Sequence, residues 1–126
     1  MDTLKLVKSW HERFHVPVLD RPSLPADRVA MRLDILEEEV RELREAVERG
    51  DLVEVLDALC DIQYVLDGNF LEFGWHAHKQ AAFSEVHASN MSKLGEDGQP
   101  ILRADGKVLK GPNFFRPNLA QFLAET

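Results

Sequence analysis

The sequence predicts an all-α protein, a bundle of four to five helices followed by a short C-terminal hairpin or loop segment. Apolar residues from Val29 to Val47 alternate spacings of four and three, which is typical of a helical bundle seam. The stretch from about Leu52 to Phe73 is apolar on almost all sides, as in a buried helix. Extended pieces are short, and we expect residues 101–102 and 108–109 to pair only as a small hairpin.

The first helix is expected from Leu4 to about His15, because Leu4, Val7, Trp10 and Phe14 fall on one helical face. Three prolines then predict an extended linker, since proline fixes φ and cannot donate a backbone hydrogen bond. They are Pro17, Pro22 and Pro25.

A long second helix is expected between Asp27, as its N-cap, and Gly50, which ends it. Its apolar seam comprises Val29, Leu33, Leu36, Val40, Leu43 and Val47. An adjoining stripe contains Ile35, Glu39, Glu42 and Ala46, so Glu39 and Glu42 border the buried face.

The third helix, from about Leu52 to Phe73, is expected to be the most buried, with Cys60 as a small buried apolar residue, and Gly74 is expected to end it. A fourth helix is expected from about Trp75 to Met91, and a last short one over residues 118–124. We expect one domain over residues 1–126, with a helical core at about 2–93 and a basic, Gly- and Pro-rich segment at about 94–126.

The net charge of −7 argues against a general nucleic-acid-binding protein. No run of about 18 apolar residues predicts a membrane span, and the charged start does not resemble a signal peptide. The single cysteine, Cys60, cannot form an internal disulfide. These features together predict a cytoplasmic protein.

Charge is distributed unevenly along the chain. Residues 34–61 contain 11 acidic and 3 basic side chains, whereas residues 90–116 contain 3 acidic and 5 basic ones. Carboxylates on an apolar helix are costly unless a cation compensates them. Hard divalent cations such as Mg²⁺ take oxygen ligands. The acidic helices therefore predict a metal site, and the basic segment could face an anionic substrate bound there.

Helical phase selects the candidate ligands. Glu39 and Glu42 lie one turn apart, and Asp57 and Asp61 lie on one stripe of the next helix with Glu54. Two such helices side by side would direct four or five carboxylates into one pocket, which favours Mg²⁺ or Mn²⁺. Glu38 points about 100° away from Glu39, because each helical residue turns by that angle. It can reach the same ion only if a second surface closes over it.

A di-iron carboxylate bundle is the competing metal hypothesis, because its ligands also project from facing helices. Such sites use Glu-x-x-His pairs. Glu12 and His15 have this spacing, but Glu85 has no histidine three residues later, and the histidines lie outside the acidic helices. We expect these histidines at the surface or at helix ends.

Further candidates contact the substrate. Lys107 and Lys110 border glycines in an anion-handling loop, since ammonium groups and glycine amides suit phosphates. Asn90 and Lys93 lie where the fourth helix ends. Trp10 could stack on a nucleobase, with core packing as its alternative.

These residues resemble the MazG-like, all-α nucleoside triphosphate pyrophosphohydrolases, in the branch labelled phosphoribosyl-ATP pyrophosphohydrolase-like. The matching motifs span roughly residues 28–117. They are Glu38-Glu39-Val40-Arg41-Glu42-Leu43, Asp57-Ala58-Leu59-Cys60-Asp61-Ile62-Gln63-Tyr64-Val65, the stretch from Glu85 to Lys93, and the stretch from Asp105 to Asn113.

The family pattern is Glu-x-x-Glu on one helix and Glu-x-x-Asp on the next. Glu39, Glu42 and Asp61 match it, but Ala58 occupies the position of the second helix's glutamate. We favour Asp57 as the replacement, and the pair Glu54-x-x-Asp57 is the other choice.

The resemblance implies a fold and a reaction. A MazG-like bundle would dimerise, or form a dimer of dimers, to complete its sites. Mg²⁺ ions held by the four carboxylates would neutralise a triphosphate, and a water activated with the help of Glu38 would attack phosphorus. The products would be a nucleoside monophosphate and pyrophosphate, with Asn90 and the three lysines on phosphate oxygens.

The reaction leads to the expectation of a Mg²⁺-dependent nucleotide pyrophosphohydrolase, with a house-cleaning role on a non-standard or excess nucleotide. Two alternatives remain open at this stage. The departure at Ala58 would suit a catalytically reduced nucleotide-binding or sensor module. The acidic residues would be incidental in a structural helical oligomer.

Overall fold

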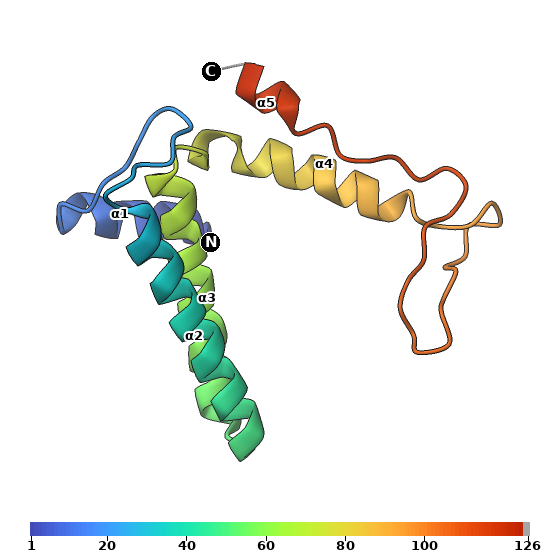
Figure 1. Cartoon of the computed structure of the whole chain (residues 1–126), viewed down its shortest axis with the longest axis horizontal. Coiled ribbons are helices and arrows are strands. Elements are labelled where there is room, and N and C mark those ends of the chain that lie inside the picture. Colours follow the sequence, from blue (N-terminus) through green and yellow to red (C-terminus); the bar gives the residue numbers. More distant parts are fainter. Residues whose placement is uncertain (125–126) are drawn as a thin grey trace. The chain divides into compact units, whose positions relative to one another are not determined.

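A computed structural model describes residues 1–124 and confirms the all-α class (Figure 1). The chain divides into two compact units, residues 1–77 and residues 78–126. Its helices are α1 (Thr3–Arg13), α2 (Val29–Arg49), α3 (Leu52–Glu72), the 3₁₀ turn η1 (His76–His78), α4 (Lys79–Met91) and α5 (Ala120–Ala124). Within the described part of the chain, no helix combines the length and apolar character needed to cross a membrane.

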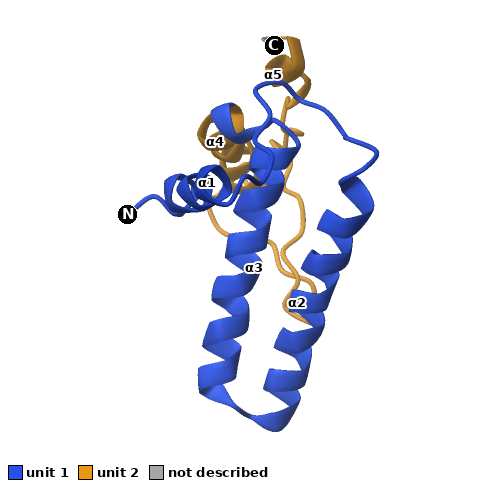
Figure 2. Cartoon of the chain, turned by 90° about the vertical axis from the view of Figure 1, so that its left-hand side faces the viewer, with its two compact units in different colours: residues 1–77 blue, residues 78–126 orange. Residues whose placement is uncertain are grey.

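Helices α2 and α3 form an antiparallel hairpin, seen side by side in Figure 2. Gly50 ends α2 in the left-handed conformation, with φ of 67°, as the sequence predicted. The backbone N–H groups of Gly50 and Asp51 return to carbonyls in the last turn of α2, at Ala46 and Val47. Asp51 then caps α3 by accepting from the backbone N–H of Glu54 at 3.1 Å. These local bonds fix a tight turn between the two helices.

The N-terminus of α2 differs from the prediction. Asp27 does not cap it; the capping position is Arg28, which makes no capping side-chain bond. The carbonyl of Pro25 instead accepts from the backbone N–H groups of Arg28 and Val29. The proline linker thus supplies the first turn, and the Arg28 side chain is free to reach α3.

The linker lies against the last turn of α3. The backbone N–H of Leu19 donates to the carbonyl of Leu71, and that of Ser23 donates to the carbonyl of Phe73. Gly74, with φ of 75°, follows α3, and a Cβ there would lie 1.9 Å from the carbonyl oxygen of Arg21. Glycine is required at this close approach.

Helix α1 packs on the half of α3 that is distant from the hairpin turn (Figure 2). Asp2 caps α1, and the hydroxyl of Thr3 donates to the buried carboxylate of Asp67 at 2.7 Å. The buried face of α1 is Val7 and His11. Trp10 and Phe14, which the spacing placed on the same face as Val7, are 39% and 61% exposed.

The α3-facing side of α2 is not its apolar seam. Arg32 and Ala46 are buried against α3, whereas Leu33, Val40 and Val47 are 45%, 48% and 59% exposed. The adjoining stripe of the sequence analysis is therefore the inner face of the hairpin. This arrangement leaves these three apolar side chains exposed on the single chain.

Helix α3 is also less covered than expected. Among the described helices α3 has the most buried residues, as predicted, but its first half is open, with Leu52, Val53, Leu56 and Leu59 exposed. Cys60 is exposed too, which corrects the expectation of a buried thiol. Burial concentrates from Asp67 to Glu72, because only that half lies under both α1 and the linker.

The second unit consists of α4, a hairpin, a returning segment and α5. The fourth helix starts later than predicted, because its first turn is η1. Leu102 and Val108 form an antiparallel bridge, which confirms the small hairpin. The returning chain bonds to α4 and to the residue that follows it: the hydroxyl of Ser89 donates to the carbonyl of Phe115, whose own N–H donates to the hydroxyl of Ser92. The single helical domain over residues 1–126 stays a prediction.

Candidate metal centre

Three carboxylates converge on the inner face of the α2–α3 hairpin. Glu39 and Glu42 come from consecutive turns of α2, and Asp61 comes from α3. One carboxylate oxygen of each residue lies within 4.8 Å of the corresponding oxygens of the other two. The structure thus brings together three of the four carboxylates that helical phase selected.

Glu39 has the most perturbed environment of the three. Its Oε2 atom is buried and has no hydrogen-bond partner. Partial burial, the charges of Glu42 and Asp61, and a hydrogen bond shared with Glu42 raise the pKa of Glu39 to about 7. A carboxyl group with this pKa is poised either to hold a proton or to give it up to a cation. The unpartnered oxygen and the repelling neighbours fit a divalent metal ion.

Asp61 shares this environment. Partial burial raises the pKa of Asp61, and the charges of Asp57 and Glu42 raise it further. Asp57 is close enough to act on Asp61, but it is exposed and is not one of the three converging residues. Glu54 is exposed as well, and its backbone N–H belongs to the α3 cap.

Ala58 is 3% exposed, one turn before Asp61 on the same face of α3. The methyl group of Ala58 therefore occupies the buried position that holds a glutamate in the family pattern described above. Glu38 is exposed on α2, adjacent to the centre in sequence, and its charge contributes to the raised pKa of Glu39.

Trp10 of α1 and Phe14, which follows α1, form a partly exposed aromatic group beside α3. The rings of Trp10 and Phe14 stack with centroids 4.8 Å apart. Tyr64 meets Trp10 edge to face at 6.2 Å, and Tyr64 lies one helical turn beyond Asp61. The sequence analysis did not select Tyr64. Its spacing of three residues from Asp61 was the signal that could have identified it.

The remaining candidates belong to the second unit. Asn90 is exposed on α4, and Lys93 follows the end of α4, where its carbonyl accepts from the backbone N–H of Gly111. Lys107 and Lys110 are exposed in and after the hairpin, and the Lys110 ammonium lies 4.9 Å from the centre of the Phe114 ring. These four residues thus share one unit.

A buried ionic network lies two turns from the metal centre along α2. Glu72 is fully buried and accepts from Arg28 through both of its oxygens, at 2.7 and 3.1 Å. Arg32 lies 2.9 Å from the second oxygen. Both arginines thus pair with one buried acid.

Comparisons with known proteins give the family. The family model described as phosphoribosyl-ATP pyrophosphohydrolase matches residues 7–90. An uncharacterised protein of Acanthamoeba polyphaga mimivirus is 50% identical over 69 residues, which are 55% of this chain and 28% of that protein. The chain thus spans less than a third of its viral relative. The crystal structure of a proposed NTP pyrophosphohydrolase from Exiguobacterium sp. 255-15 is similar over 99% of this chain and 94% of that one, with 30% identity and a TM-score of 0.46. The match over residues 7–90 includes all three converging carboxylates, and the chain belongs to the phosphoribosyl-ATP pyrophosphohydrolase family.

Proposed function

We propose that this protein is a Mg²⁺-dependent nucleotide pyrophosphohydrolase. It converts a nucleoside triphosphate, or a nucleotide like phosphoribosyl-ATP, to the monophosphate and pyrophosphate. The observation that carries the proposal is the convergence of Glu39, Glu42 and Asp61 inside the segment that matches the family. A house-cleaning role on a non-standard or excess nucleotide goes with this activity.

The chemistry of the donor set supports Mg²⁺, with Mn²⁺ as a substitute. All three ligand candidates are carboxylates, and hard divalent cations prefer oxygen. Asp57 is kept as the fourth ligand, because its charge already acts on Asp61. Mg²⁺ bound there would neutralise the negative charge of the polyphosphate.

The reaction needs few other groups. Water attacks a phosphorus atom of the substrate, a new P–O bond forms, and the bond to the departing pyrophosphate breaks. Glu38 accepts the proton of that water, because it is exposed and is the neighbour of Glu39 in the sequence. Trp10 contacts the base, and Asn90, Lys93, Lys107 and Lys110 bind phosphate oxygens.

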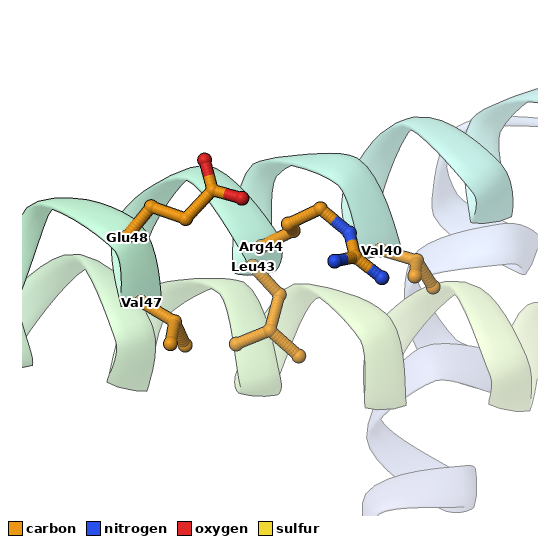
Figure 3. A pocket seen from close by; sticks show the side chains of 5 residues that line it. All are labelled: Val40, Leu43, Arg44, Val47 and Glu48. Carbon is orange, nitrogen blue, oxygen red and sulfur yellow. The ribbon is translucent and has the colours of Figure 1, made fainter.

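A second copy of the chain completes the assembly, as a homodimer or a dimer of dimers. Val40, Leu43 and Val47 line an open groove on α2 that is bordered by Arg44 and Glu48 (Figure 3). Opposite charges beside one apolar groove suit an isologous contact, in which Arg44 of each copy would meet Glu48 of the other. The second copy would also supply the surface that must close over the metal centre before Glu38 can reach the metal ion.

The test is release of pyrophosphate from a panel of deoxynucleoside triphosphates, ribonucleoside triphosphates and phosphoribosyl-ATP, with Mg²⁺ and with EDTA. Release from at least one substrate, abolished by EDTA, is expected. Nucleotide binding without release would instead favour the sensor module, which the buried Ala58 makes the second candidate. Absence of both binding and release would favour a structural oligomer.

A further inference from the structure

The rotation of α2 about its own axis differs from the one that its apolar residues favour, because the stripe adjoining the seam faces α3 in place of the seam itself. Burying Leu33, Val40 and Val47 against α3 would remove apolar surface from water, yet all three are at least 45% exposed. The charged residue Arg32 is 6% exposed on the inner face in their place. An interaction other than apolar contact must therefore hold this rotation within the single chain.

The Arg32 guanidinium supplies such an interaction. Nε donates to Oδ1 of Asn69 at 2.8 Å, Nη2 donates to the carbonyl of Val65 at 3.0 Å, and Nη1 lies 2.9 Å from Glu72. The three acceptors span two turns of α3. A planar guanidinium satisfies all of them in only one position, so it defines both the rotation and the axial register of α2.

The α3 backbone is shaped to admit this side chain. A Cβ on Gly68 would lie 2.3 Å from Nη2 of Arg32, and 3.1 Å from Nε2 of His11. Gly68 has helical geometry with no positive φ, so the missing side chain serves the close approach and not a turn. Two independent positions, 32 and 68, thus specify the same contact.

Arg32 and Glu39 are seven residues apart, so their side chains leave α2 only about 20° from each other. Whatever orients Arg32 toward α3 orients Glu39 toward Asp61. We propose that Arg32 is a positioning residue that turns and registers α2 so that Glu39 and Glu42 meet Asp61. The proposal rests on the metal centre of the proposed function.

The test measures binding of Mn²⁺ to the full chain. The readout is the electron paramagnetic resonance signal of free Mn²⁺. Arg32→Lys keeps the positive charge but loses the planar guanidinium that contacts three acceptors. We expect its Mn²⁺ dissociation constant to rise about 10-fold or more, as for other residues that orient metal ligands. Arg28→Lys is the matched control, because Arg28 shares Glu72 but bonds to neither Val65 nor Asn69. Its dissociation constant is expected to stay close to that of the unmodified protein.

Gly68→Ala provides a second approach, since it displaces the guanidinium without removing it. It should weaken Mn²⁺ binding as Arg32→Lys does, and the two changes together should be less than additive. Asn69→Ser replaces one acceptor side chain by a shorter one. It should also weaken Mn²⁺ binding, but by less. Far-UV circular dichroism identifies the folded variants.

Three outcomes contradict the proposal. The first is unchanged Mn²⁺ affinity in any folded variant of Arg32 or Gly68. The second is unfolding of all three variants while Arg28→Lys folds, which would make Arg32 a stability residue only. The third is absence of Mn²⁺ binding by the unmodified protein, which would contradict the metal centre of the proposed function and remove the basis of this inference with it.

Discussion

A carboxylate oxygen of Glu39 and one of Asp61 lie within 4.8 Å of each other, although the residues belong to different helices of the hairpin. Two carboxylates this close repel unless a proton or a cation lies near them. At neutral pH the choice between these two partners depends on the metal concentration. The first two predictions separate the two cases.

Loss of a metal ligand should abolish turnover and leave the fold intact. We expect Asp61→Asn or Glu42→Gln to lower pyrophosphate release by about 100-fold or more, because metal neutralisation of the substrate contributes several kcal/mol. Helix content by circular dichroism should persist. Glu45→Gln, on the same helix but exposed and away from the centre, is the control. Full activity in Asp61→Asn and Glu42→Gln would disprove the metal assignment.

Without metal, Glu39 should make the protein less stable as pH rises. Its pKa of about 7 in the folded chain lies above the usual 4.5, so the folded state holds the proton longer than the unfolded state. Stability is therefore lost as pH rises from 4.5 through 7. Glu39→Gln should be more stable than the parent at pH 8 by roughly 1 kcal/mol, a value reduced for solvent screening, and by less at pH 5. Urea unfolding in EDTA measures both, and equal differences at the two pH values would contradict the prediction.

His11 should act in the opposite direction. It is 2% exposed, and burial lowers its pKa below the usual 6.5. Its contribution to stability is present above pH 6.5 and is lost as pH falls from there through the lower folded-state pKa. Pro17 offers only a carbonyl, so Nδ1 of His11 is the donor in their 3.1 Å contact.

The variant that tests His11 is His11→Asn, which retains a side-chain N–H but does not titrate. We expect the difference in unfolding free energy between parent and variant to shrink as pH falls from 7.5 to 5. A constant difference over this range would show that His11 has the same pKa in the folded and unfolded states and would contradict the prediction. The control is His15→Asn, because His15 is exposed beyond the end of α1.

The two left-handed glycines of the first unit should differ in tolerance. Gly50→Ala meets nothing within 4 Å and should cost about 1 kcal/mol from its φ of 67° alone. Gly74→Ala adds a collision with the carbonyl of Arg21, so its loss of thermal stability should be clearly larger. Thermal unfolding by circular dichroism compares the pair. Equal melting temperatures would contradict the close approach at Gly74.

The exposed seam of α2 should govern assembly. Val47→Asp places a charge in the groove between Leu43 and Glu48 and should shift the protein toward monomer in sedimentation velocity. Ala30→Asp puts the same charge on an exposed position of α2 outside the groove, and it should leave the oligomeric state unchanged. A monomeric parent protein would contradict the proposed second copy.

The helices could be predicted because their signals are local. Gly50 ends α2 and the period of the apolar residues gives α3, so both helices lie within two residues of the predicted bounds. The inner face of α2 could not be predicted in this way. It depends on Arg32 contacting acceptors from 33 to 40 residues later in the chain, and no periodicity reports such a pairing.

The same distinction applies to the candidate site. Helical phase was enough to select Glu39, Glu42 and Asp61, because each lies on a stripe that a neighbouring helix must cover. His11 lies in the last turn of α1, within the expected surface or helix-end positions, but its burial could not be predicted, because the sequence does not show that the Pro17 carbonyl accepts its hydrogen bond. The substrate-binding roles of Trp10, Asn90 and the lysines stay predictions.

The contact between Gly68 and Arg32 also has an evolutionary consequence. Because a methyl group at 68 and a guanidinium at 32 cannot occupy the same space, mutation at one position constrains the other. Among homologous sequences, lineages that keep arginine at 32 should keep glycine at 68, and lineages with a larger residue at 68 should have a shorter one at 32. The two positions should therefore covary, even though they lie 36 residues apart in the chain.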